Sequence, residues 1–145
     1  ASEGNRERNK SMLITRECDY AVRVLRAMAE NRRVSVNEIC ERELITAPFA
    51  YKILKKLQKS GLVRGYRGVH GGYVLNCDLD QVTLYDIYTT IDPDLFIIDC
   101  LQPGYDCARN GADGEICTVH SELCEIQQEL CRMLQRKSLK KLING

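Results

Sequence analysis

The sequence predicts a mainly α-helical fold with a small β wing, in which a winged helix-turn-helix domain is followed by a long dimerisation helix. Three observations lead to this expectation. Apolar residues recur at helical spacing between residues 16 and 60. A glycine-rich stretch, RGVHGGYVL, joins two short segments of strand-like composition. A long amphipathic stretch stands apart near the C-terminal end.

Three helices are expected in the first half of the chain. Residues 16–31 carry apolar side chains at a period of 3.6 residues, as an amphipathic helix does. Ser35 is an N-cap residue, and the glutamate three residues later completes a capping box for a short second helix. Thr46 caps the third helix, which has Pro48 in its first turn and ends before Gly61.

A β-hairpin is expected directly after the third helix. Residues 62–66 and 72–75 form its strands, and residues 67–71 form the loop between them. Helix, turn, helix and hairpin in this order make a winged helix-turn-helix. Glycines keep the loop thin, so that its backbone can approach a DNA backbone or a minor groove, while Arg67 projects toward phosphates.

The charges of the chain are unevenly distributed, although the net charge is only +1. Residues 46–77 contain six Lys and Arg residues and no acidic residue, whereas residues 78–100 contain six Asp residues and no basic residue. This asymmetry is expected when one face of a protein meets phosphates. A solvated helix face is the ordinary explanation of such a run, but the glycine-rich hairpin beside it favours DNA binding.

The second half of the chain begins with a helix that Thr83 caps together with Asp86. A loop over residues 93–116 follows, and its length indicates function or mobility. A long helix is then expected from Thr118 to about Arg136, with an apolar stripe of Leu123, Ile126, Leu130 and Leu134. Such a helix is expected to pair with that of a second subunit, and a dimer would suit a palindromic operator.

Eight cysteines are many for a chain of 145 residues in a reducing compartment, so some are expected to bind metal or to sense redox state. Cys100, Cys107 and Cys117 are separated by six and nine residues, and His120 follows the last of them. Zinc sites usually have closer pairs, so the spacing favours an iron–sulfur cluster over zinc, and a thiol redox switch is a third option. The other five are read as small buried hydrophobes (Cys18, Cys40, Cys77) and as seam residues or alternative thiols (Cys124, Cys131).

Taken together, these motifs resemble the Rrf-type winged-helix transcription regulators from Met12 to Ile143. The resemblance rests on MLITRECDYAVRVLRAMA, YKILKKLQKSGLVRGYRG, GGYVL and the three-cysteine loop. It implies a homodimer that binds double-stranded DNA at a palindromic operator, most simply as a repressor. It also implies that the three cysteines hold a [2Fe–2S] or [4Fe–4S] cluster whose state controls DNA affinity.

The resemblance also assigns roles to individual residues. Cys100, Cys107 and Cys117 match the cluster thiolates, and the fourth ligand is either His120 or Asp19 supplied by the partner subunit. The residues expected to contact DNA lie on the third helix and in the wing, where Val69 and His70 replace a proline and a glycine of the usual pattern: Thr46, Pro48, Tyr51, Lys52, Lys55, Lys56, Arg67 and His70.

These assignments divide the chain into four parts: a disordered leader (1–11), the winged domain (12–92), the cysteine loop (93–118) and the dimerisation helix with a C-terminal segment (119–145).

The sequence has neither an apolar run long enough to cross a membrane nor a signal peptide at its start, so a cytoplasmic location is expected. No nucleophile–base pair or phosphate loop is evident, so no enzyme is expected. The alternative function is a metal-free or zinc-binding winged-helix regulator controlled by thiol oxidation or by a partner protein.

Overall fold

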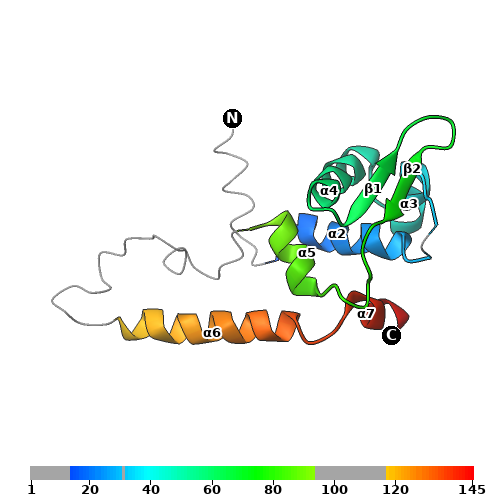
Figure 1. The fold of residues 1–145 in the computed structure, drawn as a ribbon. Helices are drawn as coiled ribbons and strands as arrows, with labels where there is room; N and C mark the ends of the chain where they lie inside the picture. The colour runs from blue at the N-terminus through cyan, green and yellow to red at the C-terminus, as the bar shows by residue number, and fades with distance from the viewer. Residues whose placement is uncertain (1–13, 31, 94–116) are drawn as a thin grey trace, which may run out of the picture.

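The structure is a computed structural model that describes residues 14–30, 32–93 and 117–145. A cluster of helices carries a β-hairpin on one side, and a long helix, α6 (Thr118–Leu134), runs outward from the cluster (Figure 1). The expected leader over residues 1–11 lies outside the described residues, and so do Cys100 and Cys107 of the cysteine loop.

Three helices form the helix-turn-helix part, as predicted: α2 (Arg16–Ala27), α3 (Val36–Glu43) and α4 (Ala47–Lys59). Helix α2 ends earlier than its periodicity predicts, because the chain turns at Met28, which is its C-cap. Thr46 occupies the N-cap position of α4 without a capping side-chain bond, and Pro48 lies in the first turn. Gly61 follows the C-cap with φ at 87°, as expected of a glycine at this position.

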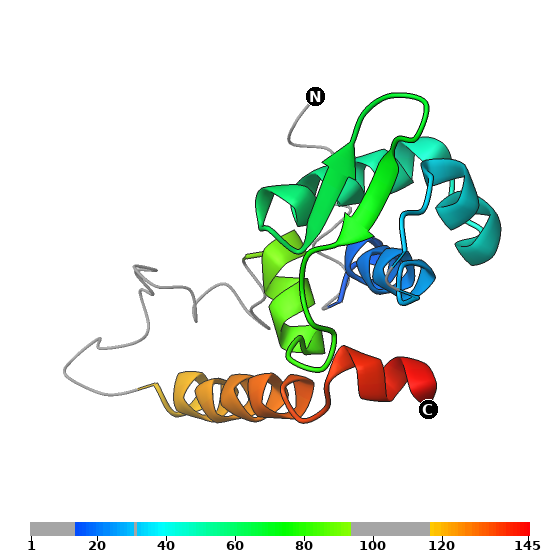
Figure 2. The same cartoon turned by 45° about the vertical axis from the view of Figure 1, so that its right-hand side comes forward.

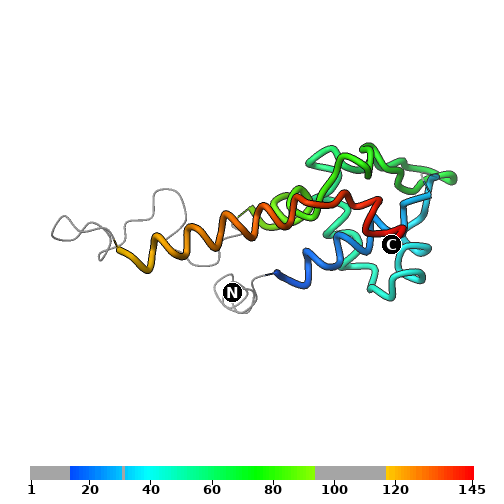
Figure 3. Tube along the Cα trace, turned by 90° about the horizontal axis from the view of Figure 1, so that it is seen from below, coloured from blue at the N-terminus to red at the C-terminus, as the bar shows by residue number. Residues whose placement is uncertain are grey.

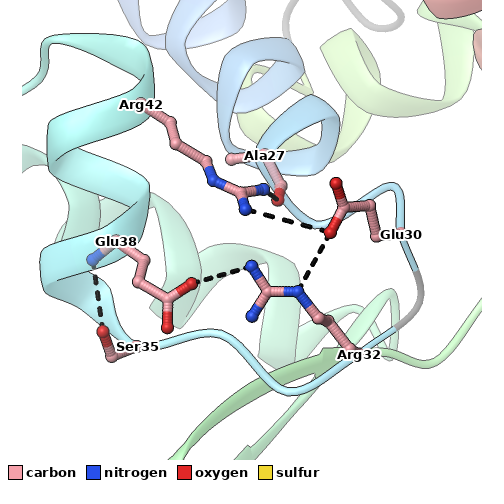
Figure 4. Close-up of polar contacts among 6 residues, drawn as sticks. All are labelled: Ala27, Glu30, Arg32, Ser35, Glu38 and Arg42. Atoms are coloured by element: carbon pink, nitrogen blue, oxygen red, sulfur yellow. Dashed lines mark hydrogen bonds and ion pairs between the residues drawn. The ribbon is translucent and has the colours of Figure 1, made fainter.

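Charged side chains hold the corner between α2 and α3 (Figure 4). The Ser35 Oγ accepts the Glu38 N–H at 3.2 Å, which is the first half of the predicted capping box. The Glu38 carboxylate accepts from Arg32 Nη2 at 3.0 Å instead of turning back to the Ser35 backbone. Arg42 Nη1 donates to the Ala27 carbonyl at 3.2 Å and so satisfies an acceptor at the C-terminal end of α2.

The core is one continuous cluster of buried side chains beneath this corner. Helix α2 packs against α3, α4 and α5 (Leu84–Ile91). Thr83 and Asp86 form the predicted reciprocal capping box at the start of α5. The fully buried residues that these helices contribute are Cys18, Ala21, Val24, Leu25, Ile39, Ala50, Ile53, Leu54, Leu57 and Ile87.

The hairpin pairs β1 (Val63–Tyr66) with β2 (Gly72–Leu75) in antiparallel register, and its loop extends past the helices (Figure 2). Val34 adds a further bridge, since its N–H donates to the Tyr73 carbonyl at 2.9 Å and its carbonyl accepts from Tyr73 at 2.7 Å. A Cβ at Gly72, where φ is 138°, would lie 2.6 Å from the Val34 carbonyl oxygen. This internal packing requires a glycine there, whatever the loop contacts outside the protein.

The C-terminal segment returns to the helical cluster, which the sequence pattern did not predict in detail. A short helix, α7 (Leu139–Asn144), follows α6. The Leu139 N–H donates to the Val82 carbonyl at 2.7 Å and the Lys140 N–H to the Leu79 carbonyl at 3.1 Å. The Leu139 side chain is fully buried in the core. Helix α6 is therefore fastened at its C-terminal end, while its N-terminal end lies far from the cluster (Figure 3).

Replacing Leu139 by alanine is expected to lower the free energy of unfolding by about 2–5 kcal/mol, because it leaves a cavity in the core. Leu142→Ala is the matched control on the same helix, since that side chain is 39% exposed. Chemical denaturation followed by circular dichroism measures both variants. An equal loss of unfolding free energy in the two variants would mean that the Leu139 side chain is not part of the core.

Candidate nucleic-acid interface and metal site

The outer face of α4 presents most of the side chains predicted to contact DNA. Residues 48, 51, 52 and 55 lie three and four positions apart and so share one side of the helix. Their side chains are exposed, while Ile53, Leu54 and Leu57 on the opposite side are fully buried. Thr46 precedes them at the exposed N-cap. The helix therefore offers one polar surface with an aromatic ring to a ligand.

Two of the predicted lysines are paired with an acid from another helix. Lys52 Nζ lies 2.5 Å from Glu17 Oε1, and Lys56 Nζ lies 2.8 Å from Glu17 Oε2. Lys56 also donates to the Ile91 carbonyl at 3.4 Å, so it joins α2, α4 and α5. The basic run of residues 46–77 contains no acid of its own, but the fold supplies one from α2. Counting charges along residues 46–77 could not detect a carboxylate that α2 brings to them.

The wing is held to the rest of the domain by Arg33, which sequence reasoning missed. Arg33 Nη1 donates to the His70 carbonyl at 2.6 Å, and its guanidinium lies 4.0 Å from the centre of the Tyr66 ring. Arg67 and the His70 side chain lie beside this anchor and are exposed. No local sequence pattern marks Arg33, because its partners Tyr66 and His70 lie far along the chain from it.

Two of the predicted metal ligands lie together at the N-terminal end of α6. Cys117 is the N-cap residue, and its Sγ accepts the His120 N–H at 3.4 Å. His120 Nε2 lies 3.5 Å from the Cys124 Sγ. His120 Nδ1 is buried and has no hydrogen-bond partner in the described structure. The imidazole thus contacts the Cys124 thiol, the Cys117 thiol contacts the His120 backbone, and one ring nitrogen is unsatisfied.

Asp19, the other candidate for the fourth ligand, forms an ion pair on the surface of α2 instead. Its carboxylate is 55% exposed and forms an ion pair with Arg23 Nε at 3.1 Å, one helical turn further along α2. Within residues 14–30, 32–93 and 117–145, no group of three or more His, Cys, Asp or Glu side chains could hold a metal ion. Since Cys100 and Cys107 lie outside these ranges, the complete ligand set stays a prediction.

The remaining cysteines differ in their surroundings. Cys18 is fully buried, and this burial is the main reason that the pKa of its thiol is raised. Cys40 and Cys77 are partly buried against the core, and burial likewise raises the pKa of Cys77. Cys131 accepts from Gln127 Nε2 at 3.5 Å on α6. These environments favour protonated thiols at Cys18 and Cys77, as expected for small packing residues.

Helix α6 buries none of its residues within the single chain. The predicted stripe is shifted in the structure, because Leu134 packs toward the core while Ile126 is 47% exposed. An outward apolar stripe follows a heptad-like spacing of four and three, with exposed side chains at Val119, Ile126 and Met133 and half-buried ones at Leu123 and Leu130. This spacing is typical of a helix that packs along a second helix. In the described part of the chain, no helix is long and apolar enough to cross a bilayer.

A helix-turn-helix with an anchored β-hairpin and a polar outer helix defines a winged-helix protein. The family model Rrf2, described as iron-dependent transcriptional regulator, matches residues 14–145. The chain therefore belongs to the Rrf2 family. This is a family of transcriptional regulators, as predicted, and not of enzymes. The predicted fold class is confirmed by the mostly helical fold with a two-stranded antiparallel sheet, which matches a solved structure of the family.

Individual relatives agree with this assignment. The chain is 29% identical over 96 residues to the HTH-type transcriptional regulator IscR of Cronobacter sakazakii, a match that covers 64% of this chain and 59% of that protein. The structure of IscR from T. potens superposes with a TM-score of 0.68 at 19% identity, covering 90% of this chain and 85% of the other. The structure of CymR, the global cysteine regulator of B. subtilis, superposes with a TM-score of 0.69 at 19% identity, covering 90% of this chain and 95% of the other.

Proposed function

We propose that this chain is a cytoplasmic, homodimeric repressor whose affinity for a palindromic DNA operator is controlled by an iron–sulfur cluster. The observation that carries the cluster is the buried, unpartnered Nδ1 of His120, a residue whose backbone N–H is bonded to the Cys117 thiol. A buried nitrogen without a partner is costly in a folded protein, so such a group calls for a ligand or a role.

The chemistry of these side chains fits a cluster. Thiolates are the usual ligands of iron–sulfur clusters, and histidine replaces cysteine in some of them. If His120 Nε2 carries the proton and donates it to the Cys124 Sγ at 3.5 Å, the lone pair of Nδ1 is left for iron. Cys100 and Cys107 are proposed to supply the other thiolates. When bound, the cluster supplies an oxidisable group whose state the protein couples to DNA affinity.

DNA is proposed to lie against the outer face of α4 and the wing. A helix of this kind reads base edges in the major groove while flanking basic residues bind phosphates. Tyr51, Lys52 and Lys55 supply polar and cationic groups on α4, and Arg67 with His70 reaches the backbone from the hairpin loop. The Arg33 anchor supports this geometry because it fixes the hairpin relative to the helices.

The outward stripe of α6 is proposed to be the dimer seam. Two copies joined along this helix would carry two recognition helices, and an operator with two half-sites matches such symmetry. The alternative function, a metal-free or zinc-binding regulator controlled by thiol oxidation or by a partner, would use the same DNA face.

The experiment that tests the cluster is anaerobic purification followed by visible absorption and by iron, sulfide and zinc analysis. A brown protein with iron and acid-labile sulfide is expected. A colourless protein with stoichiometric zinc would contradict the cluster and favour the alternative.

His120→Ala is expected to change the visible and Mössbauer spectra of the reconstituted cluster, because it removes the proposed nitrogen ligand. Cys131→Ala is the matched control, since Cys131 lies on the same helix and contacts Gln127 instead of an imidazole. Asp19→Ala is measured beside them. An altered spectrum for Asp19→Ala, with none for His120→Ala, would transfer the fourth-ligand role to the carboxylate.

Arg67→Ala and Lys55→Ala are expected to weaken DNA binding without unfolding the protein. Each lost phosphate contact should reduce the slope of log Kd against log salt by about one unit. Lys140→Ala is the control, because this lysine pairs with Asp80 away from α4. Fluorescence anisotropy across a salt series measures the slopes, and unchanged slopes for both test variants would exclude the proposed face.

Leu130→Asp is expected to give monomers, because a buried leucine at a seam contributes roughly 1.5–3 kcal/mol per chain. Glu129→Gln, which changes the neighbouring exposed residue, should leave the dimer intact. Light scattering measures the mass of each variant. A dimeric Leu130→Asp protein would remove α6 from the interface.

A further inference from the structure

The carboxylate of Glu17 lies between α2 and the proposed DNA-reading helix. Its side chain is only 17% exposed, in the first turn of α2, where the helix dipole favours an acid. It bridges two lysines one turn apart on α4, with Lys52 on one oxygen and Lys56 on the other. Two cations therefore share one anion at the edge of the proposed DNA face.

This carboxylate is held in its charged form. Partial burial raises the pKa of Glu17, but hydrogen bonds and attraction from Lys52 and Lys56 outweigh burial, so the pKa lies below its usual value. A fixed negative charge thus stands beside the lysines throughout the physiological range.

The two lysines differ in what they can do. Lys56 has a second partner in the Ile91 carbonyl and is the less exposed of the two, so it is a structural link between three helices. The Lys52 side chain is 54% exposed and stands on the outer face of α4. Its ammonium can reach outward to a phosphate only by leaving, or sharing, the Glu17 oxygen.

Pairing of the Lys52 ammonium with Glu17 is expected to affect binding to arbitrary DNA and binding to an operator to different degrees. Binding to arbitrary sequence depends almost wholly on protein cations that displace counterions from phosphates. Binding to an operator also gains hydrogen bonds to base edges, which hold α4 in one register. A carboxylate that withholds Lys52 would therefore remove a phosphate contact mainly from complexes with arbitrary DNA, in which α4 is free to shift until Lys52 meets a phosphate. In an operator complex, base contacts would fix the register of α4, and Lys52 can stay on Glu17.

We propose that Glu17 is a specificity-determining residue that acts through Lys52, suppressing binding to arbitrary DNA by competing with phosphate for its ammonium group. Glu17 itself does not touch DNA in this arrangement. The inference rests on the proposed DNA-binding function and is independent of the iron–sulfur cluster.

The test compares Glu17→Gln with Glu30→Gln in the full chain. Both substitutions remove one negative charge, but Glu30 pairs with Arg32 and Arg42 and with no residue of α4 in the described structure. Affinity for a random-sequence duplex is measured across a salt series, and affinity for an operator selected from a random pool is measured beside it.

Glu17→Gln is expected to steepen the salt slope on random DNA by about one unit, so that affinity falls about 3.5-fold further between 50 and 200 mM salt. At the lower salt it should bind random DNA more tightly, and the ratio of operator to random affinity should fall. Glu30→Gln should leave both quantities at their wild-type values. Equal behaviour of the two variants, or weaker binding of Glu17→Gln to both duplexes, would overturn the inference.

A second comparison leaves Glu17 in place, in case its substitution unfolds the protein. Lys52→Ala should reduce the salt slope on random DNA less than Lys55→Ala does, because Lys52 is already neutralised. Equal reductions would overturn the inference while leaving the proposed DNA face intact. Wild-type protein without salt-dependent DNA binding would overturn the proposed function, and the role of Glu17 with it.

Discussion

The packing of α2 into the centre of the helical cluster is the constraint on which the other elements depend. Cys18, Ala21, Val24 and Leu25 are fully buried along one side of this helix, and α3, α4 and α5 all pack against it. Small residues in this set let the neighbouring helices approach closely, and no side chain can grow there without displacing one of them. The direction in which α4 presents its outer face is therefore set by α2.

Charged side chains of α2 form ion pairs that fix how α3 and α4 are rotated about their own axes. Glu17 binds α4 near one end of the helix, and Arg26 binds the nearly buried Glu43 of α3 near the other, with Nε to Oε1 at 2.9 Å. The charged carboxylate of a side chain as buried as Glu43 needs a paired cation, so loss of Arg26 would leave an uncompensated buried charge and destabilise the fold. One helix thus carries both the apolar packing and the ion pairs that orient the proposed DNA-reading surface.

Much of this fold could be predicted from local sequence patterns. Apolar periodicity, the Thr83–Asp86 capping box, Gly61 and the two hairpin strands all depend on residues close together in the chain. The misses depend on distant partners. Helix α2 ends early because the chain must turn toward α3, and α7 forms where Leu139 fills the core. Glu17 and Arg33 gain their roles only when folding brings α4 and the wing to them. For the metal site, spacing predicted that Cys117 and His120 lie together, whereas the contact between His120 and Cys124 was not predicted.

Within the described residues, α6 packs against α5 and is clamped at its C-terminal end, which has a mechanical consequence. Backbone bonds from Leu139 and Lys140 clamp one end of this helix to the segment before α5, and the bridge between Ser138 and Thr83 reaches the residue that caps α5. A helix of this length is a rod of about 25 Å, so a tilt of about 10° at the clamp moves its far end by roughly 4 Å. Cys117 and His120 sit at that far end. A displacement of a few ångströms at Cys117 and His120 therefore corresponds to a tilt of only about 10° where α6 meets the residue that caps α5.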